Sequence, residues 1–182
     1  MADGSKQEIM EATYQALSKH GYADLSIQRI ADEFDKGKSL IYYHYEDKED
    51  LMLSFIDYML KALEASHREI MAMPQEEQLD KMLDMTLGLE DDERWRFQKA
   101  LLELRAQAAH DQKFAEKFRE IDKVAYGKFE KILENKGIED EAIVEVILSS
   151  VDGAIGRKVA TNDKEGLQEM KENIKNLVDS IK

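Results

Sequence analysis

A single proline, Pro74, interrupts a chain of 182 residues. Proteins rich in strands need many turns, and turns favour proline and glycine. Here Ala, Leu, Glu, Lys, Met and Gln, which favour helices, run in long stretches without such breaks. The sequence therefore predicts an all-α fold of about nine helices. We expect them at residues 5–20, 26–34, 38–45 and 47–73, then from 74, from 90, and at 111–137, 140–160 and 164–181.

The composition narrows the classes of function. Cysteine is absent, which excludes disulfides, cysteine zinc sites and thiol nucleophiles. No stretch approaches the roughly 20 apolar residues that span a bilayer, and the first nine residues are polar, unlike a secretory signal. We expect a cytoplasmic protein that does not enter a membrane. No motif indicates a metal or a cofactor.

The second and third predicted helices form a helix-turn-helix pattern. Ser26 is a natural N-cap, and Leu25 and Ile30 have the spacing of a hydrophobic staple. The turn at residues 35–38 is centred on Gly37. In a helix-turn-helix, the second helix of the pair enters the major groove of DNA. The sequence therefore indicates that residues 38–45 form a recognition helix.

The expected recognition helix carries hydrogen-bonding aromatic side chains on its outer side. If Ile41 and Tyr45 face inward, Tyr42, Tyr43 and His44 face outward. A tyrosine hydroxyl can donate to a phosphate oxygen, and its ring can pack on sugar or on a thymine methyl. Lys48 falls in the first turn of the next helix, where free backbone N–H groups also favour a phosphate.

This segment resembles the DNA-binding domain of the TetR family of bacterial and archaeal transcriptional repressors. The similar block covers about residues 5–55, and the matching motif positions are Ser26, Ile30, Ala31, Tyr42, His44, Tyr45, Lys48, Glu49 and Leu51. The resemblance implies a helix-turn-helix domain at residues 1–47 and an effector-binding and dimerisation domain at residues 48–182. It also implies a homodimer that binds a palindromic double-stranded DNA operator and is released by a small, largely apolar effector.

The resemblance assigns DNA contacts to individual positions. Phosphate contacts would fall on Ser26, Gln28, Tyr42, His44 and Lys48, and base contacts on Lys38, Ser39, Leu40 and Tyr43, with Lys36 on the same face. Two positions depart from the family, which often has Ser or Thr where Gly37 and Leu40 stand. Leu40 could make only apolar contacts.

The charge is unusual for a DNA-binding protein. The net charge is −13, whereas nucleic-acid binders are usually basic. Residues 1–50 contain six Lys or Arg and eleven Asp or Glu, a balance of −5. Lys36, Lys38 and Lys48 nevertheless gather on the proposed face. We expect weak non-specific affinity with a shallow salt dependence, because few phosphates are neutralised.

The larger domain is expected to contain an effector pocket, which should be mostly apolar with a few polar groups. The candidate lining residues are Leu63, His67, Met82, Thr86, Trp95, Leu102, Arg105, Phe118 and Ile121. Arg105 could bind an anionic group of the effector or could instead pair with a nearby glutamate. Methionine and aromatic residues at helical spacing could equally belong to the core.

The eighth predicted helix has small residues on one side. Gly153 and Gly156 stand in its interior, where glycine costs roughly 1 kcal/mol relative to alanine. Small residues let a second helix approach closely. Within the resemblance we expect a dimer interface at Val146, Ser149, Gly153, Gly156, Ala160, Ile174 and Leu177. Packing within one chain is the alternative.

Two rival functions remain open. Ferritin-like metal enzymes use a Glu-x-x-His motif on each of two helices, and the chain has one such pair, Glu64 and His67, without a second. No nucleophile–base pair or phosphate-binding loop indicates another enzyme. An acidic, all-helical protein-interaction module without sequence-specific DNA binding would explain the charge but not the lysines around residues 36–48.

Overall fold

The computed structural model describes residues 2–34, 36–89 and 91–181, and within these ranges it is all-α, without strands. The nine α-helices are α1 (Ala2–His20), α2 (Ile27–Ala31), α3 (Gly37–His44), α4 (Lys48–Met71), α5 (Gln75–Leu87), α6 (Asp92–Ala106), α7 (Gln112–Glu134), α8 (Glu141–Ala160) and α9 (Leu167–Ser180), with a short 3-10 helix, η1 (Gln107–Ala109). The predicted all-helical fold is confirmed.

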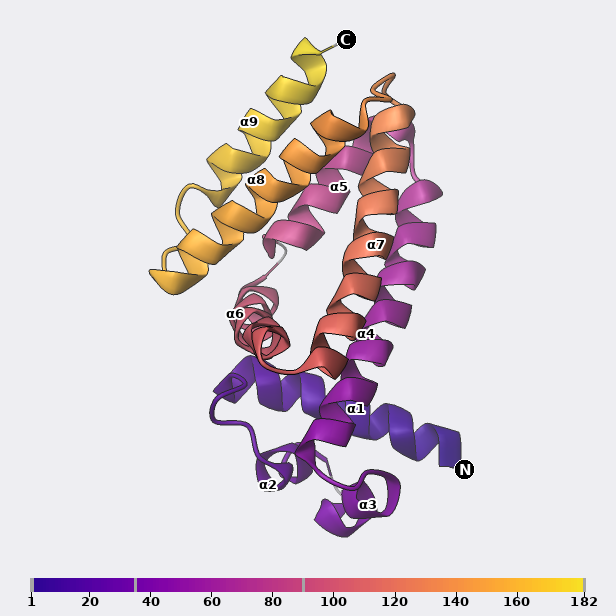
Figure 1. The fold of residues 1–182 in the computed structure, drawn as a ribbon, viewed down its shortest axis with the longest axis vertical. Helices are drawn as coiled ribbons and strands as arrows, with labels where there is room; N and C mark the ends of the chain where they lie inside the picture. Colours follow the sequence, from indigo (N-terminus) through magenta and orange to yellow (C-terminus); the bar gives the residue numbers. More distant parts are fainter. Residues whose placement is uncertain (1, 35, 90, 182) are drawn as a thin grey trace.

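The helices are arranged along one long axis (Figure 1). The helix-turn-helix, α2 and α3, lies at one end beneath α1, while α8 and α9 lie towards the opposite end. The two longest helices, α4 and α7, pack against each other and run along this axis. Helix α6 lies between the two ends and contacts both α1 and α8. Helix α4 therefore connects the recognition helix to the rest of the chain.

Capping side chains set the starts of the helices. The Ser26 Oγ atom accepts a hydrogen bond from Arg29 N at 3.2 Å, and Asp47 accepts one from Asp50 N at 2.9 Å. Aspartates also cap α6, α7 and α8. Some predicted helices were about three residues too long: α2 ends at Ala31 rather than at Phe34, α7 ends at Glu134 rather than at residue 137, and α9 begins at Leu167 rather than near Lys164.

The turn between α2 and α3 depends on glycine. Gly37 has φ +65°, in the left-handed region that side chains disfavour. Glycine therefore suits the backbone at position 37, where members of the TetR family often have Ser or Thr. Asp35, which belongs to the predicted turn, lies outside the described residues.

Two hydrophobic cores lie along the axis. The first core joins α1, α2, α3 and the start of α4 to Phe97 and Leu104 of α6 and to Phe114 of α7. The second core joins the end of α4 and the end of α7 to α5, α8 and α9. The boundary predicted at residue 48 therefore falls inside the first core, because α6 and α7 complete the packing of the helix-turn-helix.

Candidate DNA-binding surface and ligand cavity

Helix α3 exposes the side chains that the sequence assigns to DNA contacts. Ile41 is fully buried and anchors the helix to the first core. Tyr42 and Tyr43 are 56% and 79% exposed, and Lys38 and Ser39 are exposed beside them. An exposed tyrosine pair is unusual on a surface that has nothing to bind. The recognition helix therefore presents two large aromatic groups and a lysine to solvent.

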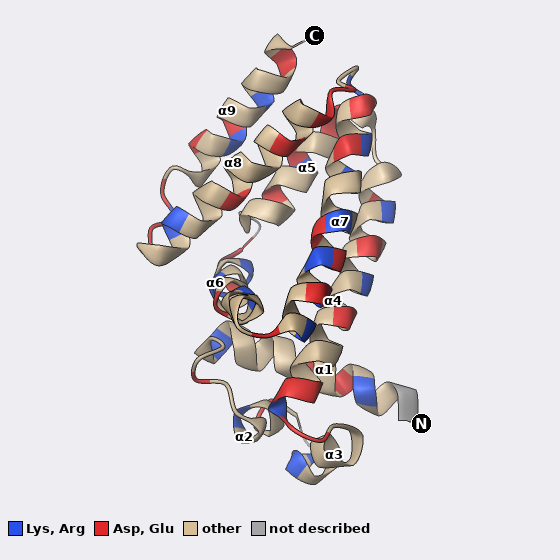
Figure 2. Cartoon of the chain, in the orientation of Figure 1, with Lys and Arg blue, Asp and Glu red and all other residues tan. Residues whose placement is uncertain are grey.

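The acidity of the chain does not extend to the helix-turn-helix helices. Neither α2 (IQRIA) nor α3 (GKSLIYYH) contains an acidic residue, and Figure 2 shows α3 without red. Lys36 is partly neutralised, because its Nζ atom lies 2.6 Å from Glu8 of α1. The local surface of α3 is therefore compatible with a phosphate backbone despite the net charge of −13.

Lys48 does not point freely towards a phosphate. Its Nζ atom donates to the carbonyl oxygen of Tyr22 at 3.2 Å and lies 4.3 Å from the centre of the Tyr22 ring. Burial lowers the pKa of this lysine. The ammonium group therefore joins the first turn of α4 to the loop between α1 and α2, which position in the sequence alone could not reveal.

The remaining residues predicted to contact DNA differ in how exposed their side chains are. Ser26 and Gln28 are exposed at the start of α2, where Gln28 donates to Asp32 at 2.8 Å. His44 is half-buried, with its ring edge-on to Tyr43 at 4.9 Å. Leu40 is half-buried and packs against the first core, so little of its side chain is available for a thymine methyl.

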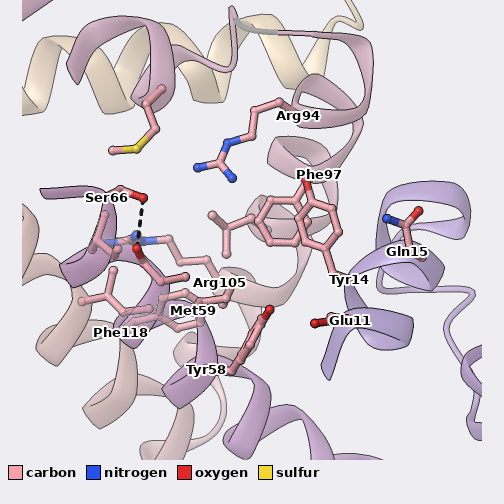
Figure 3. Close-up of a pocket in the computed structure, with 15 residues that line it drawn as sticks. Glu11, Tyr14, Gln15, Tyr58, Met59, Ser66, Arg94, Phe97, Arg105 and Phe118 are labelled. Carbon is pink, nitrogen blue, oxygen red and sulfur yellow. Dashed lines mark hydrogen bonds between the residues drawn. The ribbon is translucent and has the colours of Figure 1, made fainter. Parts of the chain in front are cut away.

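A cavity of about 340 Å³ lies at the junction of the two cores, within the usual range for small-molecule sites. Figure 3 shows side chains from α1, α4 and α6 converging on it. The lining residues are Glu11, Tyr14, Gln15, Tyr58, Met59, Ala62, Leu63, Ser66, Met85, Arg94, Phe97, Leu101, Arg105, Phe118 and Ile121. A ligand here would touch both the helix-turn-helix domain and the larger domain.

Four of the predicted effector residues line this cavity: Leu63, Arg105, Phe118 and Ile121. Five do not. Met82 and Trp95 are buried in the second core, Leu102 is exposed to solvent, and the backbone of Thr86 accepts a hydrogen bond from Gln98. The helical period explains the error on α6, because Phe97, Leu101 and Arg105 share the cavity side while Leu102 is rotated away.

His67 is the fifth predicted effector residue outside the cavity. Its Nδ1 atom is buried without a hydrogen-bond partner among the described residues. Burial, and secondarily the charge of Lys128, lowers its pKa. Lys128 itself is buried, donates to the Leu63 carbonyl, and has a pKa lowered to about 8 by burial. Both groups belong to the contact between α4 and α7.

Helix α1 supplies lining residues that sequence reasoning missed. Tyr14 packs on Phe97 with ring centres 4.5 Å apart, and Gln15 donates to Glu93 at 3.3 Å. Burial raises the pKa of Tyr14, and the nearby Arg94 acts in the opposite direction. The cavity was expected in the larger domain alone, although Tyr14 stands one helical turn after Met10 on a helix with a buried face.

One carboxylate ties α6 to the helix-turn-helix. Glu103 accepts hydrogen bonds from the backbone N–H groups of Tyr22, at 2.7 Å, and Ala23, at 3.1 Å. Gly21 has φ +73°, and a Cβ atom there would lie 3.0 Å from the Glu103 carboxylate. The neighbouring residues Leu101 and Arg105 of α6 line the cavity. Helix α6 therefore contacts the cavity on one side and the α1–α2 loop on another.

The far end of the molecule exposes apolar side chains. Val146 of α8 is 58% exposed and Leu177 of α9 is 44% exposed. A Cβ atom on Gly156 would meet nothing within 4 Å, and one on Gly153 would meet only the Arg157 side chain at 3.7 Å. Packing within the chain therefore does not explain these glycines. Ser149 and Ala160 are exposed on the same helix.

Ile174, predicted at the dimer interface, is buried in the second core. The buried stripe of α9 is Leu167, Lys171, Ile174 and Val178. A lysine occupies a core position of this stripe because Asp80 and Asp84 of α5 accept from its Nζ atom at 2.8 and 2.7 Å. The helix is therefore rotated from the expected position, and Leu177 faces outward.

The described residues offer neither a metal-binding cluster nor a membrane-spanning helix. No group of three or more His, Asp or Glu side chains in these ranges could hold a metal ion. No helix in the described part of the chain is long and apolar enough to cross a membrane.

Known proteins are similar to this chain in sequence and in fold. Residues 9–55 match the model of the bacterial regulatory proteins of the tetR family. The HTH-type transcriptional repressor AcnR of Corynebacterium glutamicum is 26% identical over 174 residues, covering 91% of this chain and 88% of that protein. A transcriptional regulator from Saccharomonospora viridis, solved in complex with choline, has 17% identity, a TM-score of 0.79 and coverage of 97% and 96%, and supports the fold alone.

The crystal structure of a TetR transcription regulator from Haloarcula marismortui is more similar. It has 33% identity, a TM-score of 0.84 and coverage of 98% of each chain. This similarity extends through the helix-turn-helix, the cavity-forming helices and the two last helices. The chain belongs to the TetR family of transcriptional regulators.

Proposed function

We propose that this protein is a ligand-responsive repressor that acts in the cytoplasm and binds a palindromic operator as a homodimer. The observation that carries the proposal is the exposed face of α3, with Tyr42, Tyr43 and Lys38 on a helix that lacks acidic residues. A protein-interaction module without DNA binding has no support from the family. An enzymatic function has no support from the relatives either, since the named relatives are regulators.

The DNA contacts follow from the exposure of each side chain. Tyr43 and Lys38 would reach base edges in the major groove, and Tyr42 would donate to a phosphate. Ser26 and Gln28 would contact the backbone at the start of α2. Lys48 acts indirectly in this proposal, because its ammonium group holds the α1–α2 loop against α4.

The dimer would form through the outward faces of α8 and α9. Exposed apolar side chains such as Val146 and Leu177 favour burial against a second copy, and Gly153 and Gly156 leave room for close helix approach. In such a dimer the two α3 helices must lie about 34–36 Å apart to read successive turns of the major groove. A twofold protein axis then requires a palindromic site.

The cavity would control this spacing. A ligand contacts Tyr14 of α1 and Leu101 of α6, so it can shift α6 relative to the helix-turn-helix. The Glu103 hydrogen bonds to Tyr22 and Ala23 would pass that shift to the α1–α2 loop. Release of DNA requires only that the ligand prefer the conformation with the wrong spacing.

The test is selection of bound duplexes from a random DNA pool at low salt, followed by sequencing. The proposal predicts an enriched palindrome with two half-sites one helical turn apart or a multiple of it. A parallel selection with Tyr43→Ala should shift the preferred base within each half-site. A folded, dimeric protein that enriches no sequence would overturn the proposal.

A further inference from the structure

One guanidinium group in the cavity has no charged partner. Arg94 extends from α6 into the cavity, towards the side on which Ser66 lies (Figure 3). Its Nε atom is buried without a hydrogen-bond partner among the described residues. The adjacent Glu93 accepts from Gln15 at 3.3 Å instead. The guanidinium lies close to the Tyr14 hydroxyl, where burial raises the pKa of that tyrosine and Arg94 acts in the opposite direction, but the Nε donor of Arg94 is unused. Leaving a buried donor of a charged group unsatisfied is costly, so Nε is poised to bind an acceptor.

The second arginine of the cavity is already neutralised. Arg105 forms an ion pair with Asp122 of α7, and its guanidinium lies 5.2 Å from the centre of the Phe118 ring. The sequence left Arg105 either as an anion-binding residue or as the partner of a nearby glutamate, and it pairs with an aspartate. Within the described ranges, however, Arg94 is the cavity arginine whose charge no carboxylate balances.

The acidic group of the cavity is poorly placed to bind a cation. Glu11 lies at the exposed rim, where it accepts from Gln7 at 3.0 Å. Aromatic rings such as Tyr14 and Phe97 could in principle hold a cation. Arg94, however, already lies 5.9 Å from the centre of the Phe97 ring. A second cation beside it would be repelled, so the charge distribution favours an anion.

The rest of the cavity suits an apolar body. Leu63, Met59, Leu101 and Ile121 line it beside the rings of Phe97 and Phe118. Such a lining recognises a ligand by buried area and shape, and methionine adapts to variable shapes. A single charged group on a flexible or compact hydrocarbon body would therefore satisfy both parts of the site.

We propose that the effector is an amphipathic carboxylate whose apolar body fills the cavity and whose carboxylate is bound by Arg94. The inference rests on the proposed function, since it names the ligand class of the same regulatory site. A planar guanidinium can donate two parallel hydrogen bonds to a carboxylate. The Ser66 hydroxyl, on the same side of the cavity, already donates to the Ala62 carbonyl at 3.0 Å, so Arg94 would be the main donor (Figure 3).

The test is calorimetric titration of the full chain, without DNA, with three probes of equal chain length: decanoate, decanol and decyltrimethylammonium, all below micelle-forming concentrations. Decanoate should bind most tightly. Arg94→Gln should weaken decanoate binding roughly ten- to hundredfold, the effect of losing a charge-assisted hydrogen bond. Arg96→Gln is the matched control on α6, because Arg96 is exposed and does not line the cavity; it should bind decanoate like the wild type.

Several results would overturn the inference: equal binding of decanol and decanoate, tighter binding of the ammonium probe, no binding of decanoate, or unchanged binding by Arg94→Gln. If Arg94→Gln does not fold, as judged by circular dichroism, the probe series on the wild type decides. Because the titration contains no DNA, an operator recovered by selection would leave the proposed function standing even if decanoate fails. Conversely, decanoate binding without any enriched operator would contradict the proposed function alone.

Discussion

The first core and the second core present different surfaces at opposite ends of the molecule. The first core buries Ile41 and presents Tyr42, Tyr43 and Lys38, which are polar or aromatic groups suited to a charged duplex. The second core buries Ile174 and leaves Val146 and Leu177 outside, which suits an apolar partner surface. The surfaces proposed for DNA binding and for self-association therefore lie at separate ends of the molecule, with the cavity between them.

The two ends of the molecule also differ in their contacts with α6. The first core includes Phe97, Ala100 and Leu104 of α6, whereas the α1–α2 loop beside it is held to α6 by exposed polar contacts, chiefly the Glu103 carboxylate on the Tyr22 and Ala23 amides. The second core is joined to α6 by buried apolar packing around Trp95. Polar contacts of this kind can be broken and remade at low cost, whereas a packed core resists rearrangement. We therefore expect ligand-induced movement at the α1–α2 loop.

Disrupting the outward face of the second core should have the largest effect. Val146→Glu places a charge where the proposed interface is apolar, and twofold symmetry places it there twice. Sedimentation should show a dimer weakened roughly hundredfold or more, with operator binding lost at the same protein concentration. Ala109→Glu, an exposed site on η1, is the control and should leave both unchanged. A Val146→Glu protein that still dimerises would contradict the assigned interface.

At the opposite end, substitutions on α3 should separate base reading from phosphate binding. Tyr43→Ala should cost about 1–3 kcal/mol at its preferred base and little at other sequences. Tyr42→Phe removes only a hydroxyl and should weaken all sequences alike, by about 1 kcal/mol. Affinities for operator variants that differ by single bases provide the measurement. Uniform effects of both substitutions would show that α3 does not read bases.

The link between the first core and α6 should affect coupling rather than binding. Glu103→Gln keeps the shape of the side chain but weakens its hydrogen bonds to the Tyr22 and Ala23 amides. We expect ligand affinity within about twofold of the wild type, and a loss of roughly fivefold or more in the ratio of operator affinities without and with ligand. Fluorescence anisotropy of labelled operator measures this ratio. An unchanged ratio would remove Glu103 from the route.

The buried lysine of the second core should affect stability rather than binding. Lys171→Met leaves Asp80 and Asp84 facing each other without their shared ammonium, and should lower the free energy of unfolding by about 1–3 kcal/mol at neutral pH. Urea unfolding is the measurement. Lys175→Met should cost less than about 1 kcal/mol, since that lysine is more exposed and contacts only Asp80 of the pair.

The same contact has a predictable pH dependence. Hydrogen bonds from Lys171, and then from Lys175, lower the pKa of Asp80 below its ordinary value of 3.8. A carboxylate whose pKa is depressed by folding stabilises the protein above pH 3.8, and the stabilisation is lost as the pH falls through the lower, folded value. The difference between wild type and Lys171→Met should therefore shrink as the pH falls below 3.8. A constant difference would contradict this assignment.

The sequence predicted the features that depend on neighbouring residues. Ser26 was identified as a cap, the fourth helix was expected from residue 47, which is the cap of α4, and the turn at Gly37 placed α3 within one residue at each end. The exposure of Tyr42 and Tyr43 followed from assigning Ile41 to the core. Such features are determined locally, because a cap or a tight turn uses groups only a few residues apart.

Features that depend on packing between distant helices were not predictable in this way. The rotation of α9 that buries Ile174 depends on Lys171 meeting Asp80 and Asp84, about ninety residues earlier. The proposed role of Arg94 depends on Asp122 of α7 having already neutralised Arg105. Neither pairing has a signature in the spacing of a single helix, so the apolar stripe of α9 placed Ile174 at the interface, and Arg94 was not among the predicted residues.

We propose that the cavity between the two cores controls the DNA-binding end. Filling the cavity by mutation tests this control most directly. Leu101 lines the cavity, whereas its neighbour Leu102 is exposed outside it. Operator affinity should be measured for Leu101→Trp and Leu102→Trp, both confirmed as folded dimers. The account predicts that Leu101→Trp, which mimics a bound ligand, binds operator roughly tenfold or more weakly, while Leu102→Trp binds like the wild type. Equal operator affinity of the two variants would contradict it.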